Sequence, residues 1–249
     1  MIHQIAARRH SRPACHLLHI CDIITAYIYD TNFTARLRRW PLDTITAIQR
    51  KDRPHADEHK MKSSAYDFPN GYFFASQEPF SLFHTFECGQ CFRWNAVSEN
   101  EYIGIANGRP LYARQEENGI FFSCTKEEFE KEWFTYFDLQ RSYSPLESIF
   151  TQNEFMTRAV EYGRGLRILK QDPWETLVSF LISQCNNIPR IKKIIETLCR
   201  LLGEPVSFAG HTLYTFPSSS ILAQCNADDL APLKAGYRTA YLLDAAQKV

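Results

Sequence analysis

Two asparagines and an arginine stand together between two apolar segments of this chain. Asn186 and Asn187 follow the first segment, and Arg190 comes just inside the second. Side-chain amides can hydrogen-bond two atoms of a base edge at once, and a guanidinium donates in a fork that matches base or phosphate oxygens. The three residues could therefore read a nucleic-acid base. Taken alone, the motif favours a plainer alternative, in which the asparagines cap a helix and Arg190 is a solvated first-turn residue.

A second candidate lies near the end of the chain, where an aromatic ring and a cation are neighbours. Gly236, Tyr237 and Arg238 are consecutive, and Tyr241 follows one helical turn later. Such a pair suits stacking on bases and holding a phosphate. The alternative is a glycine that ends a helix, followed by a tyrosine of the core. Neither this motif nor the first decides the function by itself.

Cysteine and histidine spacings offer little for metal or redox chemistry. Cys88-Gly89-Gln90-Cys91 has the spacing of a redox pair or of half a zinc site, but no second pair follows it. It also lies in a strand-like pattern rather than at a helix N-terminus. Another cluster is crowded beyond any common zinc module, and we interpret it as coincidental: Cys15, His16, His19 and Cys21. The sequence thus predicts no metal and no cofactor.

Composition narrows the class of protein further. The chain has 249 residues and equal numbers of basic and acidic residues, 28 each, so no whole-protein field draws it to nucleic acid or membrane. No window is apolar for long enough to span a membrane. The eight cysteines are scattered in a chain too large to need disulfides, which favours a reducing, cytoplasmic setting. No phosphate-binding glycine loop or Ser-His-Asp order appears, so acyl transfer and nucleotide hydrolysis lack support.

The segment from residue 80 to residue 124 is predicted to form an antiparallel meander. Its runs FSLFHTFECGQCFRW, EYIGIA, RPLYARQ and IFFSC are rich in aromatic and β-branched residues. Asn107-Gly108 and Asn118-Gly119 separate them, and Asn-Gly is the strongest short signal for a type I′ hairpin turn. Thr125 and Glu128 then form a capping box, and Ser144-Pro145 repeats a helix start.

From residue 144 onward the sequence predicts helices. Gly163 and Gly165 interrupt them, and Asp172-Pro173 begins the next with an acidic cap and a proline in the first turn. Helical spacing assigns two sets of side chains to a shared core, with Gly203 as the end of the second helix: Trp174, Leu177, Val178 and Leu181, then Ile188, Ile191, Ile194, Ile195, Leu198 and Leu202. The predicted fold class is α+β.

Three parts are predicted along the chain. Residues 1–60 carry more basic than acidic residues and show no sustained periodicity, so we interpret them as a poorly ordered extension, with Met61 as an alternative start. A transit peptide is the rival interpretation. Residues 61–165 form the sheet domain, and residues 166–249 form a partial helical domain.

In combination, these segments resemble the 8-oxoguanine DNA glycosylase/AP lyase family of the helix-hairpin-helix DNA glycosylase superfamily, and its bacterial members more than its animal ones. The matching stretches are FSLFHTFECGQCFRW, WFTYFDLQRSYSPLESIF, the run from Asp172 to Gly203, and LKAGYRTAYLLDAA. They cover most of residues 75–249 in the family's order. The occurrence of all four stretches in this order is a far more specific sign of the family than any single stretch.

The resemblance implies roles for particular residues. In the family, a glycine carbonyl in a Gly-Gln-x-Phe-Arg-Trp context accepts a hydrogen bond from N7–H of 8-oxoguanine, and Gly89 occupies that position. The family's Asn-Asn-Asn-x-x-x-Arg element fills the gap left by the flipped base and holds the opposite cytosine. A set of DNA-binding residues follows from this comparison and from the motif near the end of the chain: Cys185, Asn186, Asn187, Arg190, Tyr237 and Arg238.

The chain departs from the family pattern in two places. Cys185 replaces the first asparagine with a thiol, a poor donor and acceptor, which puts gap filling and opposite-base discrimination in doubt. The family's catalytic lysine and aspartate are expected beyond Val249, so no catalytic residue is assigned and the chain alone is predicted to be inactive. Lys248 is expected to be a solvated cation of the last helical turn rather than the nucleophile.

The resemblance implies base-excision DNA repair, with 8-oxoguanine opposite cytosine flipped out and excised. The expected partner is double-stranded DNA containing oxidised guanine, with no membrane and with the protein a monomer in the bacterial cytoplasm, associated with the nucleoid. Two alternatives remain. One is a glycosylase for alkylated purines, which the Gly-Gln-Cys-Phe-Arg-Trp run disfavours, and the other is a non-catalytic DNA-binding or interaction module on the same scaffold.

Overall fold

The computed structural model describes residues 68, 71–152 and 154–249. The chain divides into two compact units, residues 1–63 and 64–249, and the first lies outside the described residues. The predicted extension over residues 1–60 and the cluster from Cys15 to Cys21 therefore fall outside what the structure describes. No helix in the described ranges has the length and apolar character that a membrane crossing requires.

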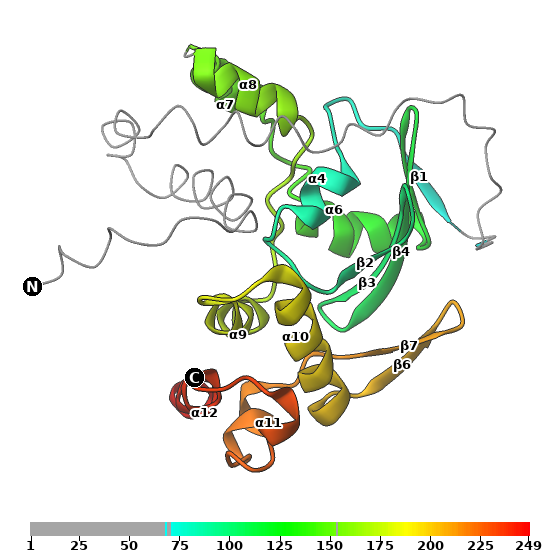
Figure 1. Cartoon of the computed structure of the whole chain (residues 1–249). Helices are drawn as coiled ribbons and strands as arrows, with labels where there is room; N and C mark the ends of the chain where they lie inside the picture. The colour runs from blue at the N-terminus through cyan, green and yellow to red at the C-terminus, as the bar shows by residue number, and fades with distance from the viewer. Residues whose placement is uncertain (1–67, 69–70, 153) are drawn as a thin grey trace, which may run out of the picture. The chain divides into compact units, whose positions relative to one another are not determined.

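An antiparallel five-stranded sheet forms the first part of the described chain (Figure 1). The strand order is β1-β5-β4-β3-β2, so β2 to β5 form the predicted meander and β1 joins at the edge beside β5. The strands are β1 (Tyr72–Phe74), β2 (Trp94–Ser98), β3 (Glu101–Ala106), β4 (Arg109–Glu116) and β5 (Gly119–Phe122). The sheet and the helices around it confirm the predicted α+β class.

The two predicted Asn-Gly turns have different outcomes. Asn107 and Gly108 both have positive φ, 51° and 73°, as a type I′ turn requires. Asn118 and Gly119 do not, and Gly119 is already paired in β5 opposite Glu116, so the predicted hairpin forms but its type I′ turn at Asn118-Gly119 is wrong. Gly119 is needed for close approach instead, because a Cβ there would lie 2.3 Å from the carbonyl oxygen of Phe74 on β1.

The first predicted strand of the meander, residues 80–94, is wrong except at its last residue, Trp94. Leu82–Glu87 is a helix, α4, and Ser81 caps it by accepting from the backbone N–H of His84. Leu82, Thr85 and Phe86 are buried, which is helical spacing that the aromatic composition of this run concealed. Only Trp94 and the residues after it are in a strand, so the segment 88–93 is irregular chain between α4 and β2.

Aromatic side chains dominate the hydrophobic core beside the sheet. Phe86 and Trp94 stack with ring centroids 4.2 Å apart, and the indole N–H of Trp94 donates to the hydroxyl of Tyr136 at 2.9 Å. Thr125 caps the helical segment after the sheet as predicted, whereas Ser144 lies inside its helix and does not cap it. The helices here are α5 (Lys126–Glu128), the π-helix η3 (Phe129–Trp133), α6 (Phe134–Tyr136), α7 (Ser144–Phe150) and α8 (Glu154–Tyr162).

A second hydrophobic core lies among the helices that follow. Asp172 caps α9 by accepting from the backbone N–H of Glu175 at 2.8 Å, as predicted. The core predictions hold for α10, but on α9 Leu177 is exposed and Ile182 is fully buried instead. The elements are α9 (Pro173–Ser183), α10 (Ile188–Leu202), α11 (Ser219–Ala223), the 3-10 helix η4 (Ala231–Leu233) and α12 (Arg238–Lys248).

A β-hairpin interrupts the part of the chain that was predicted to be wholly helical. β6 (Pro205–Phe208) pairs with β7 (His211–Tyr214), and the turn residues Ala209 and Gly210 have positive φ of 50° and 76°. Gly203 ends α10 as predicted, but its φ is −95°. Its small size is what matters, since a Cβ there would lie 2.0 Å from the carbonyl oxygen of Thr215. The boundary that the sequence predicts between a sheet domain ending at residue 165 and a helical domain starting at residue 166 stays a prediction.

Candidate nucleic-acid interface

Gly89 lies in the irregular segment between α4 and β2, with its carbonyl outside the sheet. Its φ is +90°, a conformation that residues with a Cβ rarely adopt. Among residues 68, 71–152 and 154–249, none donates a hydrogen bond to the Gly89 carbonyl oxygen. A Cβ built on Gly89 would have one near neighbour, Cδ1 of Ile188 at 3.9 Å. The glycine therefore lies beside the first residue of α10, next to the asparagine motif.

The thiols on either side of Gly89 are buried inside the fold. Cys88 and Cys91 are thiols that form no disulfide, and their Sγ atoms donate to the carbonyls of Thr85 at 3.5 Å and Phe86 at 3.7 Å. Burial raises the pKa of the Cys91 thiol well above its usual value, which disfavours the reactive thiolate. The pair follows the C-terminus of α4 rather than lying in a strand. Within the described ranges, no group of three or more His, Cys, Asp or Glu side chains could hold a metal ion.

The segment between α9 and α10, residues 184–187, forms a compact polar joint. Cys185 is exposed and has a left-handed φ of 48°. Asn186 donates from Nδ2 to the carbonyl of Ile182 at 3.0 Å, and Asn187 accepts at Oδ1 from the backbone N–H of Arg190 at 3.0 Å. Asn187 is therefore the N-cap of α10, as the structural alternative held. Capping uses its side-chain oxygen and leaves the Nδ2 group with no partner among the described residues.

Arg190 follows this joint in the first turn of α10, Arg238 reaches it from α12, and the two side chains differ in exposure. Arg190 is exposed, and its Nη2 donates to the carbonyl of Lys234 at 3.1 Å. Arg238 is only 4% exposed and donates from Nε to the carbonyl of Gln184 at 3.1 Å and from Nη2 to that of Cys185 at 3.2 Å. The predicted DNA contact of Arg238 would require its buried guanidinium to leave these carbonyls. As placed, Arg238 holds the joint together.

Exposed aromatic rings lie beside the joint. Tyr237 and Tyr241 are 55% and 49% exposed, with their ring centroids 5.8 Å apart and edge to face. The guanidinium carbon of Arg238 lies 4.5 Å from the centroid of the Tyr237 ring and supports it from the protein side. Phe180 on α9 is 61% exposed. Unlike a core tyrosine, Tyr237 thus presents a ring on which a base could stack.

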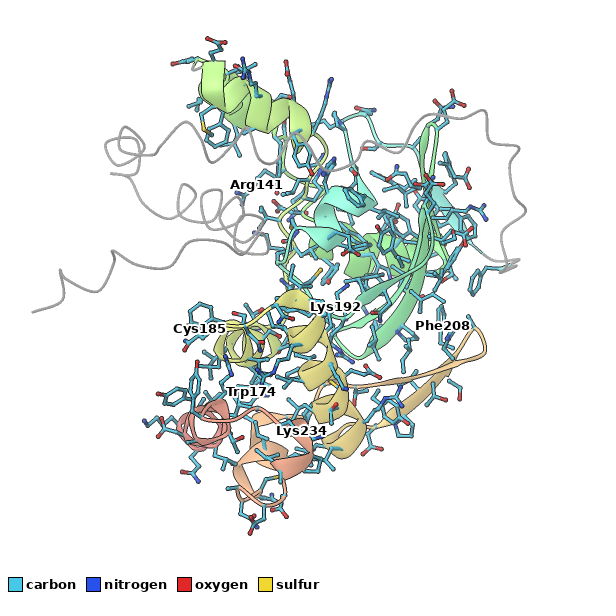
Figure 2. The ribbon with its side chains drawn as sticks, viewed as in Figure 1. Arg141, Trp174, Cys185, Lys192, Phe208 and Lys234 are labelled. Atoms are coloured by element: carbon cyan, nitrogen blue, oxygen red, sulfur yellow. The ribbon has the colours of Figure 1, made fainter. Side chains whose placement is uncertain are left out.

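Lys192 on α10 connects this helix to both ends of the Gly89 segment. Its Nζ donates to the carbonyl of Trp94 at 3.2 Å and lies 3.8 Å from a carboxylate oxygen of Glu87. Figure 2 labels Lys192 at the end of α10 nearest the sheet and Cys185 beside α9. Sequence reasoning missed Lys192, since nothing in a local pattern reveals a contact over this separation along the chain.

A second link between the sheet and the helices is a buried ion pair. Arg93 Nη1 lies 3.2 Å from Oε2 of Glu175 in the first turn of α9, with both side chains largely buried. Burial raises the pKa of Glu175, and the adjacent Arg93 opposes that rise. Arg93 also donates to the carbonyl of Tyr214 on β7. This pair fixes β2, α9 and β7 with respect to one another.

Lys248 lies away from all these contacts in the last turn of α12. Its side chain is 71% exposed and its Nζ lies 2.7 Å from a carboxylate oxygen of Asp244, an i,i+4 pair. This placement confirms the expectation of a solvated cation.

The chain is similar to several known proteins in sequence and in fold. Residues 72–177 match the model of the 8-oxoguanine DNA glycosylase N-terminal domain. An N-glycosylase/DNA lyase of Saccharomyces cerevisiae is 39% identical over 88 residues, which are 34% of this chain and 23% of that protein. The structure of MBOgg1 with a low-affinity DNA ligand is 37% identical, with a TM-score of 0.69, over 76% of this chain and 65% of that one.

A third match is the Clostridium acetobutylicum 8-oxoguanine glycosylase/lyase in complex with double-stranded DNA containing cytosine opposite 8-oxoguanine. It is 33% identical, with a TM-score of 0.67, over 74% of this chain and 66% of that one. The sheet, the helices and the sequence matches define a DNA glycosylase fold. The chain belongs to the 8-oxoguanine DNA glycosylase family.

The chain spans under two thirds of the length of these relatives, and under a quarter of the yeast protein. A more distant likeness, to the 3-methyladenine DNA glycosylase of Archaeoglobus fulgidus, is 12% identical with a TM-score of 0.54. At that identity it shows a shared fold alone and gives no reason to prefer the alkylated-purine alternative.

Proposed function

We propose that this protein acts in base-excision DNA repair, where it recognises 8-oxoguanine opposite cytosine in double-stranded DNA. Excision would be cleavage of the N-glycosidic bond with AP lyase activity, the activities after which the yeast and clostridial relatives are named. The observation that carries the proposal is the adjacency of Gly89 and Ile188, which brings the lesion-side element next to the joint that faces the opposite base.

The unbonded carbonyl of Gly89 supplies the lesion contact. 8-Oxoguanine has a proton on N7, whereas N7 of guanine carries a lone pair, so a carbonyl oxygen attracts the first and repels the second. The carbonyl has no competing donor among the described residues, and the missing side chain lets a flipped base approach the backbone. One backbone atom thus discriminates between bases that differ little in shape.

The joint supplies the contacts to the cytosine that is left without a partner. The Nδ2 group of Asn187 and the exposed guanidinium of Arg190 are donors that suit the O2 and N3 acceptors of cytosine. Tyr237 offers a ring for stacking at the same place. If these residues contacted only DNA phosphates, the protein would show no preference for one base over another opposite the lesion.

Equilibrium binding tests this proposal directly. Purified chain 1–249 is titrated into labelled short duplexes that contain 8-oxoguanine opposite cytosine, guanine opposite cytosine, 8-oxoguanine opposite adenine, or an alkylated purine. We expect the first duplex to bind more tightly than the second by about fivefold or more, at a fixed salt concentration. Equal affinity for the first two would overturn the proposal, and preference for the alkylated duplex would support the other glycosylase class.

A further inference from the structure

The side chain of Gln90, the residue after Gly89, uses both ends of its amide inside the protein. Its Nε2 donates to the carbonyls of Thr85 and Arg167, each at 2.8 Å. Its Oε1 accepts from the backbone N–H of Leu169 at 3.0 Å. One glutamine therefore links the C-terminal part of α4 to a segment nearly eighty residues later, and both polar atoms of its side chain are bonded within the protein.

The backbone of Gln90 is fixed as well. Nε2 of Gln171 donates to the carbonyl oxygen of Gln90 at 2.7 Å. Gln171 immediately precedes Asp172, the N-cap of α9, and α9 leads to the joint. The chain just after Gly89 is thus held by hydrogen bonds to residues 167–171, which lead into α9.

The other anchors of this segment lie at its two ends. Lys192 from α10 contacts the carboxylate of Glu87 before Gly89 and the carbonyl of Trp94 after it. Between these anchors, the carbonyl of Gly89 accepts from no described residue. The segment is therefore anchored at both ends and at Gln90, whereas the Gly89 carbonyl is left available as an acceptor.

We propose that Gln90 is a positioning residue that fixes the direction of the Gly89 carbonyl and thereby sets the discrimination between 8-oxoguanine and guanine. This inference rests on the proposed function. Hydrogen bonds weaken steeply as their geometry departs from linear, so a carbonyl free to rotate would lose its preference for a protonated N7. Gln90 itself touches no substrate. It acts by holding the peptide on the C-terminal side of Gly89.

Two variants and one matched control test the inference. Gln90→Ala removes all three side-chain bonds, and Gln171→Ala removes only the bond to the Gln90 carbonyl. Gln115→Ala is the control, because Gln115 also links α4 to another element, accepting from the N–H of Leu82 at 3.0 Å and donating to the carbonyl of Gly119 at 3.3 Å. In the described part of the chain, no hydrogen bond joins the side chain of Gln115 to residues 88–93.

The readout is the ratio of the Kd for the guanine:cytosine duplex to that for the 8-oxoguanine:cytosine duplex, measured with the full chain. We expect the ratio to fall about fivefold in Gln90→Ala and about threefold in Gln171→Ala, with affinity for the undamaged duplex changed by less than about twofold. Gln115→Ala should keep the wild-type ratio even if its unfolding temperature drops.

The outcomes separate this inference from the proposed function. A wild-type protein without lesion preference would overturn the proposed function, and this inference with it. A wild-type preference that both Gln90→Ala and Gln171→Ala retain would overturn the inference alone. If Gln90→Ala does not fold, Gln171→Ala decides, because it leaves the Gln90 side chain in place. An equal fall in the ratio for Gln115→Ala would also contradict a specific positioning role.

Discussion

The guanidinium of Arg238 donates to the carbonyl oxygen of Cys185 at 3.2 Å, and Cys185 has a left-handed φ of 48°. The strained residue of the joint is thus held by a buried cation from α12. A left-handed conformation costs a residue with a Cβ roughly 1–2 kcal/mol, and asparagine tolerates it better than most. The thiol at this position departs from the family pattern at a point where the backbone itself favours asparagine.

Cys185→Asn is expected to stabilise the protein and sharpen its opposite-base preference. The free energy of unfolding should rise by about 0.5 kcal/mol, because asparagine adopts positive φ more readily. The new amide should also increase the preference for cytosine over adenine opposite 8-oxoguanine. Urea denaturation and duplex titration measure the two effects.

Ala209→Asn is the matched control for this change. Ala209 has a φ of 50° in the β6–β7 turn, so the substitution relieves the same backbone strain away from the joint. It should raise stability by a similar amount without changing base preference. A gain in cytosine preference in both variants, or a loss of stability in Cys185→Asn, would contradict this account of the joint.

Arg190→Ala is expected to reduce opposite-base preference while leaving lesion preference in place. The exposed guanidinium is the donor that we assign to cytosine, and a good two-point contact is worth about 1–3 kcal/mol of discrimination. The ratio of Kd values for adenine and cytosine opposite 8-oxoguanine should fall about fivefold or more. Arg200→Ala, on the same helix and paired with Glu196, is the control for loss of an exposed cation. Equal effects of the two variants would show that Arg190 contributes only general charge.

Because of Glu78, the free energy of unfolding is expected to decrease as the pH falls into the acidic range. Bonds from the Ser142 hydroxyl and the Tyr143 backbone N–H, with the Arg167 guanidinium 3.2 Å away, lower the pKa of its carboxyl. Since the folded pKa lies below the unfolded value, this stabilisation is complete above about pH 4.3 and is lost as the pH falls through the folded pKa.

Glu78→Gln tests this linkage. The variant should lower the free energy of unfolding by about 1–2 kcal/mol at pH 7, because the largely buried Arg167 loses its charged partner. The difference from wild type should shrink as the pH falls below about 4.3. Urea denaturation over this pH range measures it, and a difference that stays constant with pH would show that the carboxylate charge does not matter. Glu117→Gln, in the exposed β4–β5 turn, should change stability by less than about 0.5 kcal/mol.

Local signals in the sequence predicted much of the fold, and long-range packing accounts for what they missed. β3, β4 and β5, the Asn107-Gly108 turn and the Asp172 cap each follow from residues within one element. Helix α4 was mistaken for a strand because its apolar and aromatic residues fit either assignment until the Ser81 cap is taken into account. The β6–β7 hairpin was missed because its turn pair, Ala209-Gly210, carries a weaker signal than Asn-Gly.

The residues of the candidate site also fall into those that a local sequence pattern predicts and those that depend on long-range packing. Asn187 and Arg190 could be singled out because amide and guanidinium groups at a helix start are a local pattern, although capping and base reading overlap at Asn187. The burial of Arg238 and the contacts of Gln90 and Lys192 depend on partners far along the chain. Spacing alone gives no means of finding such partners.

Gly89→Ala tests most directly the claim that the Gly89 carbonyl reads the lesion. The substitution forces a Cβ into a φ of +90° and so must turn the peptide, whereas Gly108→Ala imposes a similar strain at φ +73° in a hairpin turn with open space around it. The measurement is the Kd ratio between guanine:cytosine and 8-oxoguanine:cytosine duplexes for wild type and both variants. We predict that the ratio collapses toward one in Gly89→Ala and stays at the wild-type value in Gly108→Ala. A Gly89→Ala protein that is folded and keeps the full lesion preference would contradict the account.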